Sequence, residues 1–397
     1  MTVHGICDPR FAAVREEFAR NFRERGEVGA AVCVLADGRT VVDLWGGVAE
    51  RATGRPWERD TLAVVWSSTK GAVALCAHVL LSRGTLDLDT PVARFWPEFA
   101  QHGKGTVTVR TALDHRAGVP VFREPLRPGG LYDWDYMVTM LAAEEPVWEP
   151  GTVQGYHATT FGHLVGELVR RASGKPLAEF FRDEVAGPLG VEFYLGLPAG
   201  LEGRVAPTIR PSLPRRSAAV SHFAARARQD PASVQALVGT NTGRFGRPRE
   251  VDSPDSYRAV LPSQGGISHA RGLAGLYAPL ALGGAAGGVL LVDKSAVDRL
   301  AAYPSALVSD AVLLIGVRFA LGFWKSSDNR GGPPGARDSL LLGGAAFGHP
   351  GMGGSVGFAD PEARLAFGYV MNKQGPGVAL NDRGQSLIDA AYRALGR

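Results

Sequence analysis

The sequence predicts an α+β fold in which one sheet is assembled from both ends of the chain. Two observations carry this expectation. Strand patterns beside amphipathic helical patterns occur in the first 100 residues and return after residue 330. Between them, the patterns are mostly those of helices and loops. We therefore expect a sheet domain from residues 1–100 and 330–397, and an inserted, mostly helical domain from residues 101–329.

The N-terminal elements follow from short local patterns. Apolar residues recur at helical spacing over residues 11–25, which predicts an amphipathic helix packed on the sheet. Residues 28–35 and 40–48 predict two strands, and Asp37-Gly38 between them tolerates the positive φ angles of a tight hairpin. A strong helical pattern then begins near residue 67 and ends at Arg83-Gly84.

The remaining elements repeat both kinds of pattern. Helical patterns of the middle region cover residues 135–143, 160–172, 176–185 and 270–282. Strand patterns near the C-terminus cover residues 340–347, 355–358 and 364–372, followed by a helical pattern over residues 380–395. The uncharged stretch 272–292 contains Pro279 and two glycine pairs, so we expect a buried helix and a turn there and not a membrane span.

The composition fits a large globular protein and argues against some classes of partner. With 397 residues, 45% of them hydrophobic, the chain can bury a sizeable core. Its 43 basic and 39 acidic residues give a net charge of only +4, so we expect no nucleic-acid or membrane partner. Residues 204–250 hold nine Arg and two acidic residues. A basic patch for an anionic partner is one interpretation, but a solvated loop is favoured because aromatic residues are sparse there.

The cysteines and histidines argue against a disulfide framework and a metal site. Three scattered cysteines suit small core residues, and no His-Glu-x-x-His or cysteine–histidine spacing is present. The glycine-rich run 283–288 lacks the Lys-Ser/Thr ending of a phosphate-binding loop, so we expect no cofactor. The first residues contain no basic segment followed by an apolar run, which predicts no signal peptide and a cytoplasmic location. The sequence leaves the oligomeric state open.

Ser67-Ser68-Thr69-Lys70 is a candidate for nucleophilic chemistry. Ser67 and Lys70 are three residues apart, so on a helix their side chains lie on one face. A hydroxyl needs a base to become a nucleophile, and a lysine in a desolvated pocket can lose its proton and act as that base. The motif alone also fits a helix N-cap at Ser67 beside a solvated Lys70. Other segments must distinguish the two interpretations.

Gly353-Gly354-Ser355-Val356-Gly357 is a competing signal. It matches Gly-x-Ser-x-Gly, the nucleophile elbow that joins a strand to a helix in α/β-hydrolases. That arrangement requires a later histidine, and none follows His349. The residues after Ser355 also have a strand pattern. We therefore interpret this motif as the glycine-rich beginning of a strand.

Further segments, in a consistent order, resemble one family. They are residues 84–98, residues 107–120, Trp148-Glu149-Pro150-Gly151 with Tyr156, and residues 347–362. Together with Ser67-x-x-Lys70, they resemble the serine β-lactamase and penicillin-binding-protein superfamily, in particular its class C β-lactamase-like branch and most of all the family VIII carboxylesterases. The resemblance implies a β-lactamase-like fold with an antiparallel sheet. It also implies an active site in the cleft between the sheet domain and the helical domain.

The resemblance assigns roles to individual residues. It makes Ser67 the acylated nucleophile, Lys70 its activating partner and Tyr156 the second proton carrier. It places an oxyanion hole at the backbone N–H groups of Ser67 and Met352. It further implies that His349, Gly351 and His157 bind substrate, His349-Pro350-Gly351 standing where the family has Lys-Thr-Gly or a histidine variant. Whether Lys70 or Tyr156 takes the first proton is left open.

Two departures from the family pattern bear on the substrate. Ala158 stands where β-lactamases and peptidases usually have an asparagine that binds the substrate amide. His349, which is mostly neutral at pH 7, replaces a lysine that pairs with the substrate carboxylate. Both changes weaken recognition of a carboxylated amide, so the resemblance implies a serine carboxylesterase for small-molecule esters with weak or no β-lactam hydrolysis. A β-lactamase or D-Ala-D-Ala peptidase, an acyltransferase and a non-catalytic scaffold are the alternatives. Candidates for an acyl pocket are Trp45, Phe122, Tyr132, Trp134, Phe323 and Trp324.

Overall fold

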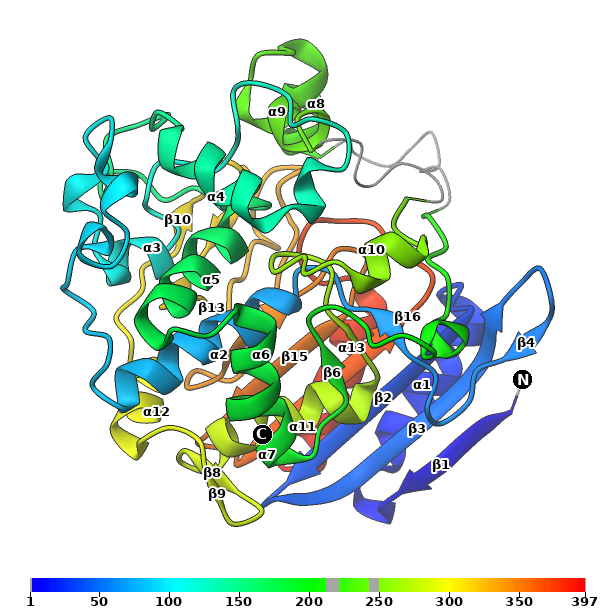
Figure 1. Ribbon diagram of the computed structural model, residues 1–397. Coiled ribbons are helices and arrows are strands. Elements are labelled where there is room, and N and C mark those ends of the chain that lie inside the picture. The colour runs from blue at the N-terminus through cyan, green and yellow to red at the C-terminus, as the bar shows by residue number, and fades with distance from the viewer. Residues whose placement is uncertain (1, 212–220, 243–249, 397) are drawn as a thin grey trace.

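The computed structural model describes residues 2–211, 221–242 and 250–396 (Figure 1). Within these residues the main element is a nine-stranded sheet, in the order β1-β3-β2-β16-β15-β14-β13-β12 with β4 beside β3. Its N-terminal strands are β1 (Val3–Cys7), β2 (Gly29–Ala36), β3 (Arg39–Glu50) and β4 (Arg55–Pro56). Its later strands are β12 (Phe319–Ala320), β13 (Phe323–Lys325), β14 (Phe347–Pro350), β15 (Val356–Asp360) and β16 (Leu365–Met371). The described strand pairs of this sheet are antiparallel, as the α+β prediction requires.

Strands from the two ends of the chain meet at the centre of the sheet. β16 pairs with β2 in a register that runs from Leu365 opposite Ala36 to Met371 opposite Ala30. The hairpin between β2 and β3 turns at Asp37 and Gly38, whose φ angles are 49° and 75°. Positive φ at both central residues is the type I′ geometry expected of an Asp-Gly hairpin. The predicted sheet built from both termini is thereby confirmed.

The two faces of the sheet pack against different helices. Alternate residues of β2 point to opposite sides, because side chains in a strand alternate. Val32 and Val34 join the core beneath α1 (Ala12–Glu24) and α13 (Asp382–Ala394), whereas Ala31 and Cys33 join the core beneath α11 (Ala270–Ala281) and α2 (Thr69–Ser82). In Figure 1, α11 lies in front of the sheet, and α1 and α13 lie behind it.

Small residues let α11 approach the sheet closely. A Cβ atom added at Gly357 of β15 would come within 2.6 Å of Tyr277 and 2.8 Å of Leu273, both on α11. An added Cβ at Gly368 of β16 would collide with the backbone of Ala270. The second glycine of the Gly-x-Ser-x-Gly motif thus serves helix–sheet packing, in agreement with its interpretation as part of a strand.

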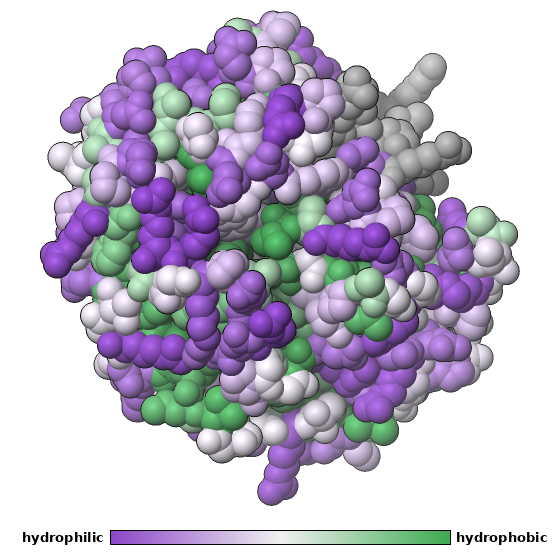
Figure 2. Space-filling model, viewed as in Figure 1, coloured by the Kyte–Doolittle hydropathy of each residue, from purple (hydrophilic) through white to green (hydrophobic). Residues whose placement is uncertain are grey.

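The middle of the chain supplies most of the remaining helices. They are α3 (Val109–Leu113), α4 (Trp134–Ala143), α5 (Thr160–Ser173), α6 (Leu177–Phe181), α7 (Gly187–Leu189), α8 (His222–Gln229), α9 (Val234–Thr240), α10 (Pro254–Arg258) and α12 (Lys294–Ala301). Its short strands are β5 (Ala63–Val64), β6 (Phe193–Tyr194), β7 (Ile267–Ser268), β8 (Ala285–Ala286), β9 (Val289–Leu290), β10 (Val308–Ser309) and β11 (Gly316–Val317). Hydrophilic residues cover much of the face shown in Figure 2, and apolar residues are visible in the hollow near its centre.

Two details of the sequence-based prediction are wrong. The strand expected over residues 340–347 is reduced to isolated bridges at Ser339 and Leu340, and β14 begins only at Phe347. The chain bends in between, where the N–H of Gly343 donates to the Tyr392 hydroxyl on α13. The domain boundary expected at residue 330 is too late for the sheet, because β12 and β13 precede it and α11 packs on the sheet. The division into two domains stays a prediction.

Three further expectations concern the uncharged stretch, the cysteines and the basic stretch. The uncharged stretch 272–292 forms α11 and the β8–β9 hairpin. None of the helices in the described part of the chain is long and apolar enough to cross a membrane. Cys33 and Cys76 are buried in the core and Cys7 is half-buried, all with free thiols. The basic stretch 204–250 lies partly outside the described residues.

Candidate active site

Ser67 lies at the turn that leads into α2. The residue before it, Trp66, has a φ of 50°, which is unusual for a bulky side chain and is typical of backbone strain at functional sites. Ser68 is the N-cap of α2, and Ser68 and Lys70 are fully buried, whereas Ser67 stays half-buried and lines a cavity. The interpretation of Ser67 as an N-cap beside a solvated Lys70 is therefore wrong.

The Lys70 amine is enclosed by oxygen atoms. Its Nζ lies 3.2 Å from Ser67 Oγ, 2.7 Å from the carbonyl oxygen of Ala158 and 2.8 Å from that of Ser263. Burial lowers the pKa of this amine well below its ordinary value. A neutral amine donates to both carbonyls and accepts from the Ser67 hydroxyl, while an ammonium donates to all three oxygens. The site therefore satisfies both protonation states, and only the hydrogen bond to Ser67 reverses.

Tyr156 completes this group. Its side chain is buried to 7% exposure, and Lys70 Nζ lies 4.9 Å from the centre of its ring. Burial raises the pKa of the phenol above its ordinary value, and a hydrogen bond with the Ser67 side chain opposes that shift. Burial therefore favours a neutral amine and a protonated phenol beside the Ser67 hydroxyl. The structure thus brings together the hydroxyl, amine and phenol that the sequence singled out.

A buried carboxylate fixes the loop that carries Tyr156. Asp310 Oδ1 accepts hydrogen bonds from the backbone N–H groups of Tyr156 (3.0 Å), Val312 (3.0 Å) and Leu313 (2.9 Å). Burial raises the pKa of this carboxyl to about 6. Val312 and Leu313 line the same cavity as Tyr156. Asp310, which no sequence motif indicated, therefore joins the backbone of Tyr156 to that of Val312 and Leu313 in the cavity wall.

The three residues expected to bind substrate lie behind the cavity wall. His157 accepts from the N–H of Val119 (3.1 Å) and donates to the carbonyl of Gly155 (2.6 Å), and burial lowers its pKa to about 4. His349 is fully buried, donates to its neighbour's carbonyl at 2.7 Å, and has a pKa lowered to about 3 by burial and the nearby Lys70. None of the three is among the described residues that line the cavity.

Gly351 and Ser355 close a tight turn beside β14. The N–H of Gly351 donates to the carbonyl of Ser355 at 2.7 Å, and a Cβ atom at Gly351 would collide with Ser355 Oγ. Ser355 Oγ in turn donates to the carbonyl of Val65 at 2.8 Å and is buried. Gly351 and the serine of the Gly-x-Ser-x-Gly motif therefore hold the turn in place and do not face the cavity.

The backbone N–H groups of Ser67 and Met352 are available at the cavity. Both residues line it, and within the described part of the chain neither N–H donates a hydrogen bond to the protein. Such unpartnered N–H groups beside a reacting carbonyl are the components of an oxyanion hole. Both groups lie at the same cavity, and their role as an oxyanion hole stays a prediction.

The cavity itself has a volume of about 380 Å³ and walls that are mainly apolar. Among the described residues that line it, none carries a formal charge. Its apolar side chains are those of Trp66, Ala158, Phe223, Val238, Val312, Leu313, Trp324, Pro350, Met352 and Val378. Of the aromatic residues expected at an acyl pocket, Trp324 is a lining residue, and the other five lie elsewhere. Phe223 and Val238 come from α8 and α9, which no motif indicated.

No metal centre is evident in the described ranges. No group of three or more His, Cys, Asp or Glu residues there is arranged to hold a metal ion. The buried histidines around Tyr156 are occupied by backbone groups or packed against aromatic rings. The polar groups that meet beside Ser67 Oγ are the Lys70 amine and the Tyr156 phenol.

Comparison with known proteins finds relatives that match most of the chain. Residues 18–392 match the family described as Beta-lactamase. The chain is 35% identical over 386 residues to the esterase/beta-lactamase LipL of Mycobacterium tuberculosis, covering 94% of this chain and 83% of that protein. A crystal structure of a family VIII carboxylesterase is 38% identical, with a TM-score of 0.85, and covers 99% of this chain and 100% of its own. A penicillin-binding protein homologue from Caulobacter crescentus is 36% identical, with a TM-score of 0.86 and the same two coverages.

Proposed function

The chain belongs to the beta-lactamase family, and on that premise we propose that it is a serine carboxylesterase that hydrolyses neutral small-molecule esters through an acyl-enzyme on Ser67. The observation that carries the proposal is the convergence of Ser67, Lys70 and Tyr156 at one cavity with uncharged described walls. The esterase and carboxylesterase relatives support the same reaction class.

The first half-reaction transfers the acyl group to Ser67. Ser67 Oγ attacks the ester carbonyl carbon while its proton passes to the neutral Lys70 amine. The oxygen of the tetrahedral intermediate accepts hydrogen bonds from the backbone N–H groups of Ser67 and Met352. Removing one such donor typically lowers kcat roughly 100-fold to 1000-fold. The bond to the alcohol oxygen then breaks, and Tyr156 donates its proton to that oxygen and regains one from the Lys70 ammonium.

The second half-reaction releases the acid. A water molecule attacks the acyl carbon and gives up a proton through Tyr156 and Lys70. The bond between the acyl carbon and Ser67 Oγ breaks, and the oxygen recovers its proton. The neutral amine and the protonated phenol are restored, so the cycle can repeat. An alcohol or amine that takes the place of water would convert the same intermediate into an acyl-transfer product.

The uncharged walls also favour neutral esters over β-lactams and peptides that carry a carboxylate. A substrate carboxylate placed in this cavity would lose water without gaining a cation from the described lining residues, which is unfavourable. The family's asparagine is replaced by Ala158, whose carbonyl is bound to Lys70. We therefore propose weak or absent β-lactam hydrolysis and a preference for esters that carry no charge near the scissile bond.

Hydrolysis of p-nitrophenyl esters of short acids tests the proposal. Ser67→Ala should abolish turnover, and a fluorophosphonate probe should label Ser67 when the modified peptide is mapped by mass spectrometry. Ser68→Ala is the matched control, because it removes the adjacent buried hydroxyl, which donates to the His349 carbonyl at 3.1 Å. Turnover by Ser67→Ala would overturn the proposal. Faster turnover of a chromogenic cephalosporin than of any ester would favour a β-lactamase. Absence of a fluorophosphonate adduct, together with no turnover of either kind of substrate, would favour a non-catalytic scaffold.

A further inference from the structure

The turn that carries Met352 is held from behind by the N-terminus of α13. We propose that Asn381, supported by Arg383, is a positioning residue that fixes the orientation of the Met352 N–H group. The inference rests on the proposed function, since it assigns the means by which one of the two oxyanion donors is kept in place. Asn381 does not line the cavity that holds Ser67, so it acts only through the turn.

The turn, residues 351–354, has a defined geometry. The N–H of Gly354 donates to the carbonyl of Gly351 at 3.0 Å, and Gly353 has a φ of 90°. Glycine with positive φ at the third position is the signature of a type II turn, in which Met352 occupies the second position. The N–H of Met352 takes no part in closing this turn, and its direction depends on how the turn as a whole is held.

The turn is anchored through one carbonyl group. The carbonyl oxygen of Gly353 accepts from the N–H of Gly375 at 2.8 Å, from Asn381 Nδ2 at 2.8 Å and, more weakly, from Arg383 at 3.4 Å. Positions 354 and 375 leave no room for a side chain of their own beside this contact. A Cβ atom at Gly354 or Gly375 would collide with the Asn381 amide. The glycines of the turn and its neighbour therefore provide the space that the Asn381 side chain occupies.

Asn381 is itself held at both ends. Its Oδ1 accepts from the N–H of Arg383 at 3.2 Å and caps α13, while its Nδ2 donates to the turn. Arg383 is a rigid neighbour: its side chain is 5% exposed and forms an ion pair of 2.6 Å with Glu27, whose side chain is fully buried. It also donates to the carbonyl of Lys373 at 2.7 Å. Rotation of the Asn381 side chain would break both the hydrogen bond that caps α13 and the hydrogen bond to the Gly353 carbonyl.

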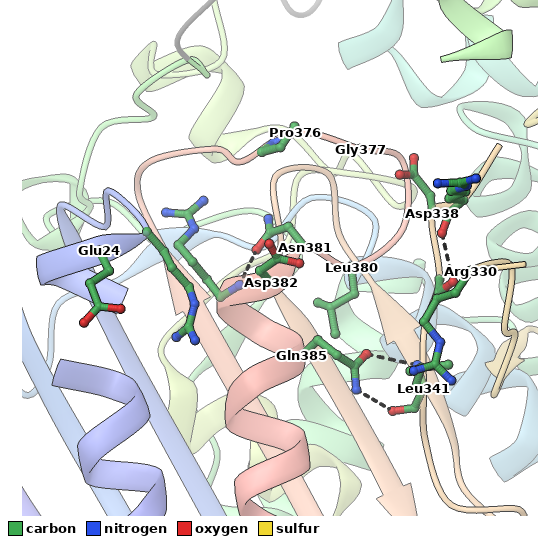
Figure 3. Close-up of a pocket in the computed structure, with 14 residues that line it drawn as sticks. Glu24, Arg330, Asp338, Leu341, Pro376, Gly377, Leu380, Asn381, Asp382 and Gln385 are labelled. Atoms are coloured by element: carbon green, nitrogen blue, oxygen red, sulfur yellow. Dashed lines mark hydrogen bonds between the residues drawn. The ribbon is translucent and has the colours of Figure 1, made fainter. Parts of the chain in front are cut away.

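A second cavity lies on the other side of the segment that contains Gly377, and one residue that lines it provides the control. Asn381 and Gln385 both line this cavity of about 510 Å³ (Figure 3). They lie one helical turn apart on α13, yet the Gln385 side chain bonds to the backbone of Leu341, with its Oε1 and Nε2 each at 3.0 Å. Gln385 therefore shares the helix and the surroundings of Asn381 but does not contact the turn. Gly377 lines both cavities, so only a thin segment separates them.

The decisive variant is Asn381→Ser. Serine keeps a side-chain oxygen that can cap α13 but lacks the amide that donates to Gly353. We expect kcat for a p-nitrophenyl ester to fall about 10-fold to 100-fold, with KM and the melting temperature near those of the wild type, because an oxyanion donor acts in the transition state. Affinity for a boronic acid that forms a tetrahedral adduct on Ser67 should fall by a similar factor. Gln385→Ala should leave kcat and boronate affinity unchanged.

Two further variants make every outcome informative. Asn381→Asp, which also keeps the cap and cannot donate, replaces Asn381→Ser if that variant does not fold. Wild-type kcat in either variant would overturn the inference, as would a loss shared equally by Gln385→Ala. Ser67→Ala distinguishes a failure of the proposed esterase function from a failure of the positioning role of Asn381. If it retains activity, the proposed function fails, whereas an inactive Ser67→Ala beside a fully active Asn381→Ser refutes the positioning role alone.

Discussion

Replacement of Lys70 by methionine tests which group takes the proton of Ser67. Methionine keeps a long apolar side chain and removes the amine. The amine hydrogen bonds to Ser67 Oγ and to the carbonyls of Ala158 and Ser263. A general base contributes roughly 100-fold to 10,000-fold in rate, or about 3 to 5 kcal/mol of transition-state stabilisation. We therefore expect Lys70→Met to lower kcat by at least about 100-fold.

The same variant should also lower stability, but by less than the sum of its two lost hydrogen bonds to carbonyl groups. Each buried carbonyl that loses its donor costs about 1 to 3 kcal/mol. This loss is offset in part because the unfavourable burial of an amine is removed, which is the same burial that lowers the pKa of Lys70. Urea unfolding of both proteins measures the difference. A variant that is inactive because it is unfolded would show no cooperative transition.

The pH profile decides the assignment. If the neutral amine is the base, kcat/KM of the wild type rises as pH rises through the lowered pKa of Lys70 and then stays level until Tyr156, whose pKa is raised, loses its proton. The midpoint of the acidic limb should lie well below 10.5, the ordinary value for lysine. A midpoint at or above 10.5, or a Lys70→Met variant that keeps more than a tenth of the wild-type kcat while Tyr156→Phe is inactive, would make the phenol the base.

Three other outcomes follow from buried groups. Ser355→Ala should lower stability by about 1 kcal/mol in thermal unfolding and leave esterase activity intact, because its hydroxyl donates to the Val65 carbonyl and does not line the cavity; a loss of activity would restore it as a candidate nucleophile. Arg383→Met leaves Glu27 buried without its cation, so urea unfolding should show a loss of about 3 to 5 kcal/mol, part of which Glu27→Gln in the same chain restores. Burial raises the pKa of the Asp310 carboxyl from 3.8 to about 6. The folded protein is therefore destabilised as pH rises between these values, because the buried carboxyl loses its proton there. Asp310→Asn should therefore gain stability relative to the wild type by up to about 3 kcal/mol from pH 4 to pH 7, and a pH-independent difference would contradict this.

The parts of the site that depend on local chain geometry could be predicted from the sequence. The hairpin at Asp37-Gly38 follows from the backbone freedom of two residues, and the proximity of Ser67 and Lys70 follows from one helical turn. The place of Tyr156 came from a resemblance over several segments. A sheet shared by the two ends of the chain was expected because strand patterns occurred at both ends, whereas the pairing of β16 with β2 within it was not specified.

The side to which a residue faces could not be predicted in the same way. His157 and His349 lie next to site residues in sequence, yet their rings point into the protein and bond to backbone groups. A motif places the backbone near the cavity but does not specify which side chains the surrounding elements leave exposed. Phe223 and Val238 reach the cavity from α8 and α9, a contact that depends on tertiary packing and has no local signal.

The central pairing of β2 with β16 also constrains synthesis of the protein. A nascent polypeptide that has emerged only as far as residue 340 contains Ser67, Lys70 and Tyr156 but lacks Met352 and the strand that joins β2. At that stage β2 presents an open edge, which invites pairing with other unfinished chains. Catalytic competence and protection from aggregation should therefore arrive together, once the segment from Met352 to Met371 has left the ribosome.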